Sequence, residues 1–281
     1  MPLTTLVQPA ELRLHLEDPS WVIVDCGFEL ADPSAGRRAY ESAHIPGAVY
    51  AHLDKDLSGA RTGANGRHPL PEPADLAARL GQWGIAPHTQ VVAYDQGPGS
   101  FAARLWWLLR WVGHEAVAVL DGGLARWQAE GGPLSTEVPS ASDGPAYPVR
   151  PRSEAWVDAD QVAASVAAGR PLLDARAPER FRGELEPLDA VAGHIPGAVN
   201  APFTDNLDGD GRFLPPATLA ERFAALSDGR PGRETVCMCG SGVTACHNLL
   251  AMAVAGLDGA RLYPGSWSEW CSDPQRPAAT G

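Results

Sequence analysis

The chain has 281 residues, of which 44% are hydrophobic, and a formal net charge of −12 at pH 7. This length suits one large or two ordinary domains, and the acidic balance argues against a nucleic-acid-binding surface. No apolar run reaches the roughly 18 residues of a membrane span and no signal peptide is recognisable, while five cysteines without the spacing of a disulfide scaffold fit the reducing cytoplasm.

Short β-rich runs alternate with helical patterns along the chain, which predicts an α/β protein with central parallel sheets flanked by helices. The predicted strands are Trp21–Val24, Gln90–Tyr94, Ala116–Leu120, Pro171–Leu173 and Glu234–Cys237. The predicted helices are Pro73–Trp83, Ser100–Val112, Asp158–Ala168, Pro216–Leu226 and Ala245–Ala255. Residues 134–152 hold four prolines and no periodicity, which indicates an interdomain linker.

The chain also repeats itself. A β-rich run ending at Asp25 is followed by H-I-P-G-A-V from His44, and one ending at Asp174 is followed by the same six residues from His194. Later landmarks recur in the same order, which indicates a tandem duplication. His44 and His194 occur in both copies, so we interpret them as structural turn residues.

Cys239 lies between a β-rich run and a helical pattern, in the sequence C-G-S-G-V-T-A. Glycines on both sides of Ser241 let such a loop turn its N–H groups inward. The N-terminus of the following helix adds about half a positive charge at the same point. These features favour the thiolate form of Cys239 near neutral pH and predict a nucleophile. Aligning the two copies places Asp95 opposite Cys239, so the first copy is expected to be inert.

Residues Cys239–Ala245 resemble the active-site loop of the sulfurtransferases of the rhodanese superfamily, in the form typical of 3-mercaptopyruvate sulfurtransferases. With the repeat, the resemblance covers nearly the whole chain. It implies an inactive rhodanese-like domain over residues 1–133, a linker over 134–152 and a catalytic rhodanese-like domain over 153–281. It implies Cys239 as the catalytic residue, in an active-site loop formed by Gly240, Ser241, Gly242, Val243 and Thr244.

The implied reaction is a double displacement. Cys239 takes a sulfur atom from a small anionic donor, 3-mercaptopyruvate, as a persulfide and passes it to cyanide, a thiol or thioredoxin. No cofactor is expected. No metal site is expected either, because Cys237 and Cys239 form C-x-C and no second pair or spaced histidine completes a zinc set.

Anion recognition is expected to fall to arginine, since Lys55 is the only lysine. In the resembling family, an arginine at the place of Arg180 binds the anionic end of the donor, and this role is carried to Arg180. A second arginine commonly follows a Glu-Pro pair, but Leu188 stands there, so Arg182 is expected to compensate. Arg176 is expected to make a structural bond near its strand end.

His68 resembles the histidine that some mercaptopyruvate enzymes are proposed to use beside the loop serine. Ser241, His68 and Asp54 are therefore expected to form a hydrogen-bonded relay at the substrate. The alternative is that His68 is a solvated turn residue.

The remaining cysteines and tryptophans are expected to be structural. Cys237 alternates with Cys239 along a strand and should face the core. Cys246 is expected to be buried, with a redox role beside Cys239 as the alternative. Trp106–Trp107 and Trp267 are interpreted as core residues, although Trp267 is also a candidate wall of the substrate pocket.

Three other functions share features with this sequence. A thiosulfate sulfurtransferase usually carries bulky cationic residues where this chain has Gly240 and Ser241, although Leu188 weakens the keto-acid assignment. A cysteine-based phosphatase requires C-x5-R, but Ala245 stands at the arginine position and the next arginine is Arg261. A non-catalytic rhodanese-like module would be expected to lack the cysteine.

Overall fold

The computed structural model describes residues 1–281, and the chain divides into two compact units. Unit 1 comprises Met1–Gly59, Leu70–Arg152 and Gly209–Arg212, and unit 2 comprises Ala60–Pro69, Ser153–Asp208 and Phe213–Gly281. The segment 60–69 therefore belongs to unit 2 although it lies in the first half of the sequence. Residues 134–152 contain no helix and belong to unit 1. None of the helices has the length and apolar character needed to cross a membrane.

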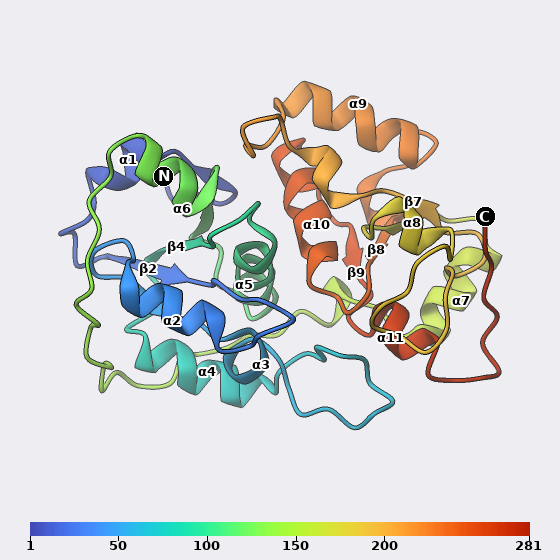
Figure 1. Ribbon diagram of the computed structural model, residues 1–281, viewed down its shortest axis with the longest axis horizontal. Coiled ribbons are helices and arrows are strands. Elements are labelled where there is room, and N and C mark those ends of the chain that lie inside the picture. The colour runs from blue at the N-terminus through green and yellow to red at the C-terminus, as the bar shows by residue number, and fades with distance from the viewer. The chain divides into compact units, whose positions relative to one another are not determined.

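Unit 1 is built on a five-stranded parallel sheet with the strand order β1-β5-β4-β2-β3. Its strands are β1 (Leu6–Val7), β2 (Trp21–Asp25), β3 (Val49–Tyr50), β4 (Gln90–Tyr94) and β5 (Val117–Leu120). Its helices are α1 (Pro9–Arg13), α2 (Ala35–Ser42), α3 (Leu53–Asp56), α4 (Pro73–Gln82), α5 (Ser100–Trp111) and α6 (Gly123–Ala129), which flank the sheet in Figure 1.

Unit 2 repeats this plan with a four-stranded parallel sheet of order β7-β6-β8-β9. Its strands are β6 (Leu172–Asp174), β7 (Val199–Asn200), β8 (Val236–Met238) and β9 (Arg261–Leu262). Its helices are α7 (Ala159–Ala167), α8 (Pro178–Phe181), α9 (Pro216–Leu226), α10 (Thr244–Val254) and α11 (Ser266–Trp270), together with 3-10 turns at Ser153–Ala155, Phe203–Asn206 and Gly232–Glu234. In Figure 1 the helix α10 runs beside β8 and β9.

The central strands are buried on both faces, which is why they appear in the sequence as continuous apolar runs. All five residues of β4 and all three of β8 are buried. The core of unit 1 gathers Ile23, Val92, Tyr94, Leu120 and Trp127, and that of unit 2 gathers Leu172, Val236, Met238, Tyr263 and Trp267. The prediction of an α/β protein with a tandem duplication, in which each copy has a central parallel sheet flanked by helices, is thus confirmed by the two sheets and their flanking helices.

The strand order places the same loop at the same point of each unit. The order β3-β2-β4-β5 in unit 1 corresponds to β7-β6-β8-β9 in unit 2. Asp25 pairs in register with Tyr94, and Asp174 with Met238. The next residue is Asp95 in unit 1 and Cys239 in unit 2. Both residues directly follow a central strand, at the point of the sheet where the chain changes from building on one side to building on the other. Ligands of open α/β sheets bind at such a point.

The two sheets differ in the partner of the buried aspartate that ends an equivalent strand, Asp25 in unit 1 and Asp174 in unit 2. In unit 2, Asp174 accepts hydrogen bonds from Nε of Arg176 at 3.0 Å and from its Nη2 at 2.7 Å. In unit 1, the residue two positions after Asp25 is Gly27, whose backbone N–H donates to Oδ1 of Asp25 at 2.7 Å. Asp25 is fully buried without an ion-pair partner. Burial raises the pKa of the Asp25 carboxyl to about 6.

We predict that Asp25 makes the protein less stable as the pH rises from about 4 to about 6. A raised pKa means that the folded state binds this proton more tightly than the unfolded state, so ionisation costs stability over that interval. The loss is expected to reach at most about 3 kcal/mol, since a tenfold change in proton affinity corresponds to about 1.4 kcal/mol. Denaturant unfolding across this pH range should show a shallower decline in Asp25→Asn than in wild type. The matched control is Asp143→Asn at an exposed site in unit 1, and identical pH profiles for all three proteins would contradict the assignment.

Candidate active site

Cys239 lies at the end of β8 and is 2% exposed. The backbone N–H groups of Ser241 and Gly242 donate to its Sγ at 3.4 and 3.1 Å. The helix α10 begins at Thr244, directly after this loop. The N–H groups of two of the five predicted loop residues thus point at the sulfur, and they favour negative charge on it.

The loop is held by the turn Tyr263–Ser268, which includes the first residues of α11. The N–H of Cys239 donates to Oγ of Ser266 at 3.1 Å. The carbonyl oxygens of Cys239 and Gly240 accept from the N–H groups of Trp267 and Ser268, each at 3.0 Å. The curvature of the loop therefore does not depend on its own residues alone.

The two glycines of the loop have different physical roles. Gly242 has a φ of +78°, and a Cβ there would lie 2.4 Å from the carbonyl oxygen of Pro264. Both the backbone conformation and the close approach exclude a side chain. Gly240 has no positive φ, and a Cβ there would lie 3.1 Å from Nη2 of Arg67 and 3.4 Å from Nη1 of Arg180. Gly240 thus leaves room for two guanidinium groups beside the nucleophile.

The structure brings two of the three residues predicted to form a relay into contact. Nδ1 of His68 lies 2.7 Å from Oγ of Ser241, within hydrogen-bond distance, and both residues are buried. This contact excludes the alternative of a solvated turn histidine. Asp54 lies on α3 in unit 1, where its N–H donates to Nδ1 of His52 at 3.1 Å. The participation of Asp54 in the relay stays a prediction.

Arg180 lies at the site, together with an arginine that the sequence interpretation missed. Nη2 of Arg180 contacts Oε1 of Glu186 at 2.6 Å and Oδ2 of Asp189 at 3.3 Å. Arg67 contacts the other oxygen of Asp189 through Nη1. The Nε atoms of Arg67 and Arg180 are buried without a hydrogen-bond partner, and unpaired buried donors are expected where a ligand supplies the acceptor. The only sequence signal for Arg67 was its position directly before His68.

Arg182 does not join this cluster. Its guanidinium is 43% exposed and forms two hydrogen bonds of 2.8 Å with Glu184. The expectation that Arg182 compensates for Leu188 is therefore not supported by the geometry, because the side chain is engaged at the surface. The second guanidinium group beside Gly240 is that of Arg67. Leu188 itself is exposed.

Arg176 has the structural role expected of it. Besides its bonds to Asp174, it donates to the carbonyl oxygen of Gly193 at 2.8 Å, and its guanidinium lies 4.9 Å from the centroid of the Trp267 ring. Trp267 is fully buried. It therefore supports Arg176 from within the core.

Cys237 and Cys246 are buried near Cys239 without sharing its environment. Sγ of Cys237 lies 3.9 Å from Sδ of Met252, and burial raises the pKa of the Cys237 thiol. Sγ of Cys246 donates to the carbonyl oxygen of Gly242 at 3.3 Å. All five cysteines are free thiols, and no group of His, Cys, Asp or Glu residues has the arrangement of a metal site.

The repeated histidines and the tryptophan pair have structural surroundings. Nδ1 of His44 lies 2.6 Å from the carbonyl oxygen of Tyr40, and Nδ1 of His194 lies 2.8 Å from that of Phe181. Trp106 and Trp107 are buried on α5.

Unit 1 holds a carboxylate where unit 2 holds the sulfur. Asp95 is buried, and its two oxygens accept from the N–H groups of Gly97, Gly99, Phe101 and Ala102 at 2.9 to 3.2 Å. The same kind of loop therefore directs backbone N–H donors at the side chain of the equivalent residue in both units.

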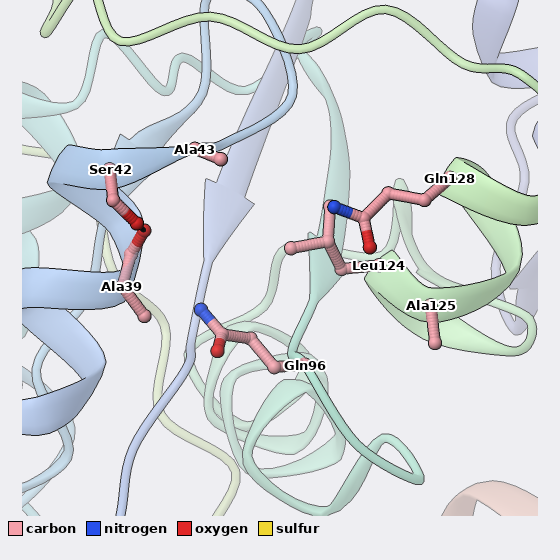
Figure 2. A pocket seen from close by; sticks show the side chains of 7 residues that line it. All are labelled: Ala39, Ser42, Ala43, Gln96, Leu124, Ala125 and Gln128. Atoms are coloured by element: carbon pink, nitrogen blue, oxygen red, sulfur yellow. Dashed lines mark hydrogen bonds between the residues drawn. The ribbon is translucent and has the colours of Figure 1, made fainter.

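A cavity of about 290 Å³ adjoins this loop in unit 1. Figure 2 shows its lining, which consists of Ala39, Ser42, Ala43, Gln96, Leu124, Ala125 and Gln128. It contains neither a thiol nor a charged side chain.

Comparisons with known proteins agree with this geometry. Residues 8–130 and 158–273 match the family model of the rhodanese-like domain. The chain is 54% identical over 279 residues to a Pseudomonas aeruginosa protein named probable 3-mercaptopyruvate sulfurtransferase, covering 98% of each chain. It is 43% identical over 279 residues to the putative thiosulfate sulfurtransferase SseB of Mycobacterium tuberculosis, covering 98% of this chain and 97% of that one. The solved 3-mercaptopyruvate sulfotransferase SseA from Escherichia coli is similar with a TM-score of 0.82 and 31% identity, covering 94% of this chain and 99% of that one.

We predict that Gly242→Ala slows alkylation of Cys239 by iodoacetamide at pH 7 by at least about tenfold. A side chain there forces the backbone to move, so the N–H groups no longer point at Sγ and the thiolate loses their stabilisation. Gly240→Ala is the matched control and should change the rate less than about threefold, because its Cβ meets the ends of flexible side chains. Mass spectrometry of the Cys239 peptide measures both rates. Equal losses in the two variants would contradict the roles given to the two glycines.

Proposed function

The chain belongs to the rhodanese family, and from that premise we propose that it is a sulfurtransferase that takes sulfur from 3-mercaptopyruvate through a persulfide on Cys239. The observation that carries this proposal is the sulfur of Cys239 beneath the N–H groups of Ser241 and Gly242. Preorganised donors of this kind stabilise a charged sulfur without any rearrangement during the reaction. A persulfide anion formed at Cys239 is stabilised by the same two N–H groups.

In the first half-reaction, the Cys239 thiolate attacks the thiol sulfur of the donor. The carbon–sulfur bond breaks, its electron pair passes to the carbon atom, and the proton of the thiol ends on that carbon. The products are pyruvate and the enzyme persulfide, and no oxidant or reductant is consumed. In the second half-reaction a nucleophilic acceptor, such as cyanide, a thiol or thioredoxin, removes the outer sulfur and restores the thiolate.

The charged groups beside Gly240 suit the donor. The nitrogens nearest to the place of a Cβ on Gly240 are Nη2 of Arg67 and Nη1 of Arg180. The Nε atoms of both residues are buried without a hydrogen-bond partner, so together the two guanidinium groups offer a fork of donors to one carboxylate. Arg67 supplies the second cation whose absence at Leu188 weakened the assignment from sequence.

His68 and Ser241 supply the proton path in this proposal. Their 2.7 Å contact places a hydroxyl and an imidazole next to the loop that carries Cys239. An imidazole can take up and return a proton near neutral pH. We assign to this pair the transfer of the thiol proton toward the carbon atom that leaves with pyruvate, with Asp54 as the third member of the relay.

Thiosulfate is the second candidate donor. Its support is the 43% identity to a relative named as a putative thiosulfate sulfurtransferase, together with two arginines that suit a sulfonate as well as a carboxylate.

The five free thiols support a location in the reducing cytoplasm.

The test of the function is sulfur transfer to cyanide from each donor, measured side by side. We expect kcat/KM for 3-mercaptopyruvate to exceed that for thiosulfate by at least about tenfold, or roughly 1.4 kcal/mol of differential transition-state binding. After exposure to donor alone, the Cys239 peptide should gain one sulfur that cyanide removes. Cys239→Ser should lose transfer from both donors and gain no sulfur. A preference for thiosulfate would transfer the assignment to the second candidate, and an adduct on Cys246 would overturn the catalytic role of Cys239.

Arg180→Ala and Arg67→Ala should each lower kcat/KM for the donor. The expected loss of transition-state stabilisation is about 1.5 to 3 kcal/mol, the scale of a lost charge-assisted hydrogen bond. Arg182→Ala is the matched control and should leave kcat/KM nearly unchanged, because its salt bridge with Glu184 is exposed. Steady-state kinetics with 3-mercaptopyruvate give all three values. An effect of Arg182→Ala as large as that of Arg180→Ala would contradict this placement of the donor.

A further inference from the structure

One carboxylate links the two arginines of the active site. Oδ1 of Asp189 contacts Nη1 of Arg67, and its Oδ2 lies 3.3 Å from Nη2 of Arg180. Asp189 is 6% exposed, whereas Arg67 and Arg180 are 20% and 17% exposed. The carboxylate thus lies deeper than either cation, and it joins a residue of the 60–69 segment to one of α8.

The ion pairs around Asp189 form a closed network without excess charge. Glu186 contacts Arg180 at 2.6 Å and Arg176 at 3.5 Å, and Arg176 also pairs with Asp174. The network therefore contains three guanidinium groups, from Arg67, Arg176 and Arg180, and three carboxylates, from Asp174, Glu186 and Asp189. Its formal charge is zero.

We infer that Asp189 is a specificity-determining residue that keeps the donor site electroneutral and thereby favours a donor with one negative charge over a donor with two. A monoanionic carboxylate gains directed hydrogen bonds from the arginines, and a second negative charge meets no uncompensated cation in a partly buried network. This inference rests on the proposed donor preference, since it explains why two arginines at the nucleophile do not select the thiosulfate dianion.

Asp189 also acts as a positioning residue for Arg67. The side chain of Arg67 forms its only ion pair with Asp189. Of the two guanidinium nitrogens that remain, Nε and Nη2, it is Nη2 that lies nearest to Gly240. The carboxylate therefore sets both the charge of the site and the direction in which this guanidinium points.

The experiment changes the charge of the network in opposite directions. Asp189→Asn keeps the shape of the side chain and gives the network one excess positive charge, whereas Arg67→Gln gives it one excess negative charge. Glu184→Gln is the matched control, because it makes the same carboxylate-to-amide change in the exposed pair with Arg182. Cys271, the one cysteine that is not buried, is replaced by Ser in every protein.

The first readout is independent of sulfur transfer. It is the ratio of the alkylation rates of Cys239 with iodoacetate, an anion, and with iodoacetamide, its neutral analogue. We expect Asp189→Asn to raise this ratio by at least about fivefold, Arg67→Gln to lower it by a similar factor, and Glu184→Gln to change it less than about twofold. General disruption of the site would move the two active-site variants in the same direction.

The second readout is the ratio of kcat/KM for thiosulfate to that for 3-mercaptopyruvate. It should rise at least about fivefold in Asp189→Asn and fall in Arg67→Gln. If wild type uses neither donor, the proposed function fails while the alkylation ratio still decides the charge of the site. If Asp189→Asn does not fold, the fall expected in Arg67→Gln remains as the test. Alkylation ratios that do not differ from that of Glu184→Gln would overturn the inference.

Discussion

The turn Tyr263–Ser268 is the element on which the geometry of the nucleophile depends. Ser266 adopts a positive φ of 53°, and its Oγ donates to the carbonyl oxygen of Tyr263 at 2.8 Å while it accepts from the N–H of Cys239. The next two N–H groups of the turn bind the carbonyl oxygens of Cys239 and Gly240. With its carbonyl groups bound on one side, the loop presents its N–H groups to the sulfur on the other. The stabilisation of a thiolate or persulfide is therefore a property of two segments that are held together.

The same turn also binds the 60–69 segment. The N–H of Arg67 donates to Oγ of Ser268 at 2.9 Å. A Cβ on Gly66, which has a φ of +83°, would lie 2.7 Å from the carbonyl oxygen of Gly265, so the two backbones approach as closely as a glycine allows. Because of this contact, the groups that meet the donor and those that carry the thiolate are positioned by one structure. A substitution in the turn is thus expected to affect donor binding and nucleophile reactivity together.

The two units place different side chains, Asp95 and Cys239, in the same backbone arrangement. In unit 1 the donors of the loop are occupied by the carboxylate of Asp95, which is part of the fold and cannot be exchanged. In unit 2 they point at the thiol sulfur of Cys239, the atom proposed to gain and lose a second sulfur atom. The neighbouring network adds directed hydrogen-bond donors without adding net charge. In the function proposed here, reactivity at Cys239 arises from local dipoles, and discrimination between donors arises from the charge balance of the neighbouring network.

The sequence by itself determined the tandem α/β plan and the buried parallel strands, because apolar periodicity and the repeat are local patterns that can be recognised without a structure. It also predicted Cys239 as the nucleophile from a glycine-flanked cysteine, and it predicted Arg180 and the pairing of His68 with Ser241 through the resemblance. Only the tertiary structure placed Arg67 and Asp189 beside Arg180 and the side chain of Arg182 at the surface. Arg67 and Asp189 are 122 residues apart. Contacts of that range leave no periodic trace in the chain, since they depend on how a turn, a loop and an extended segment pack against one another.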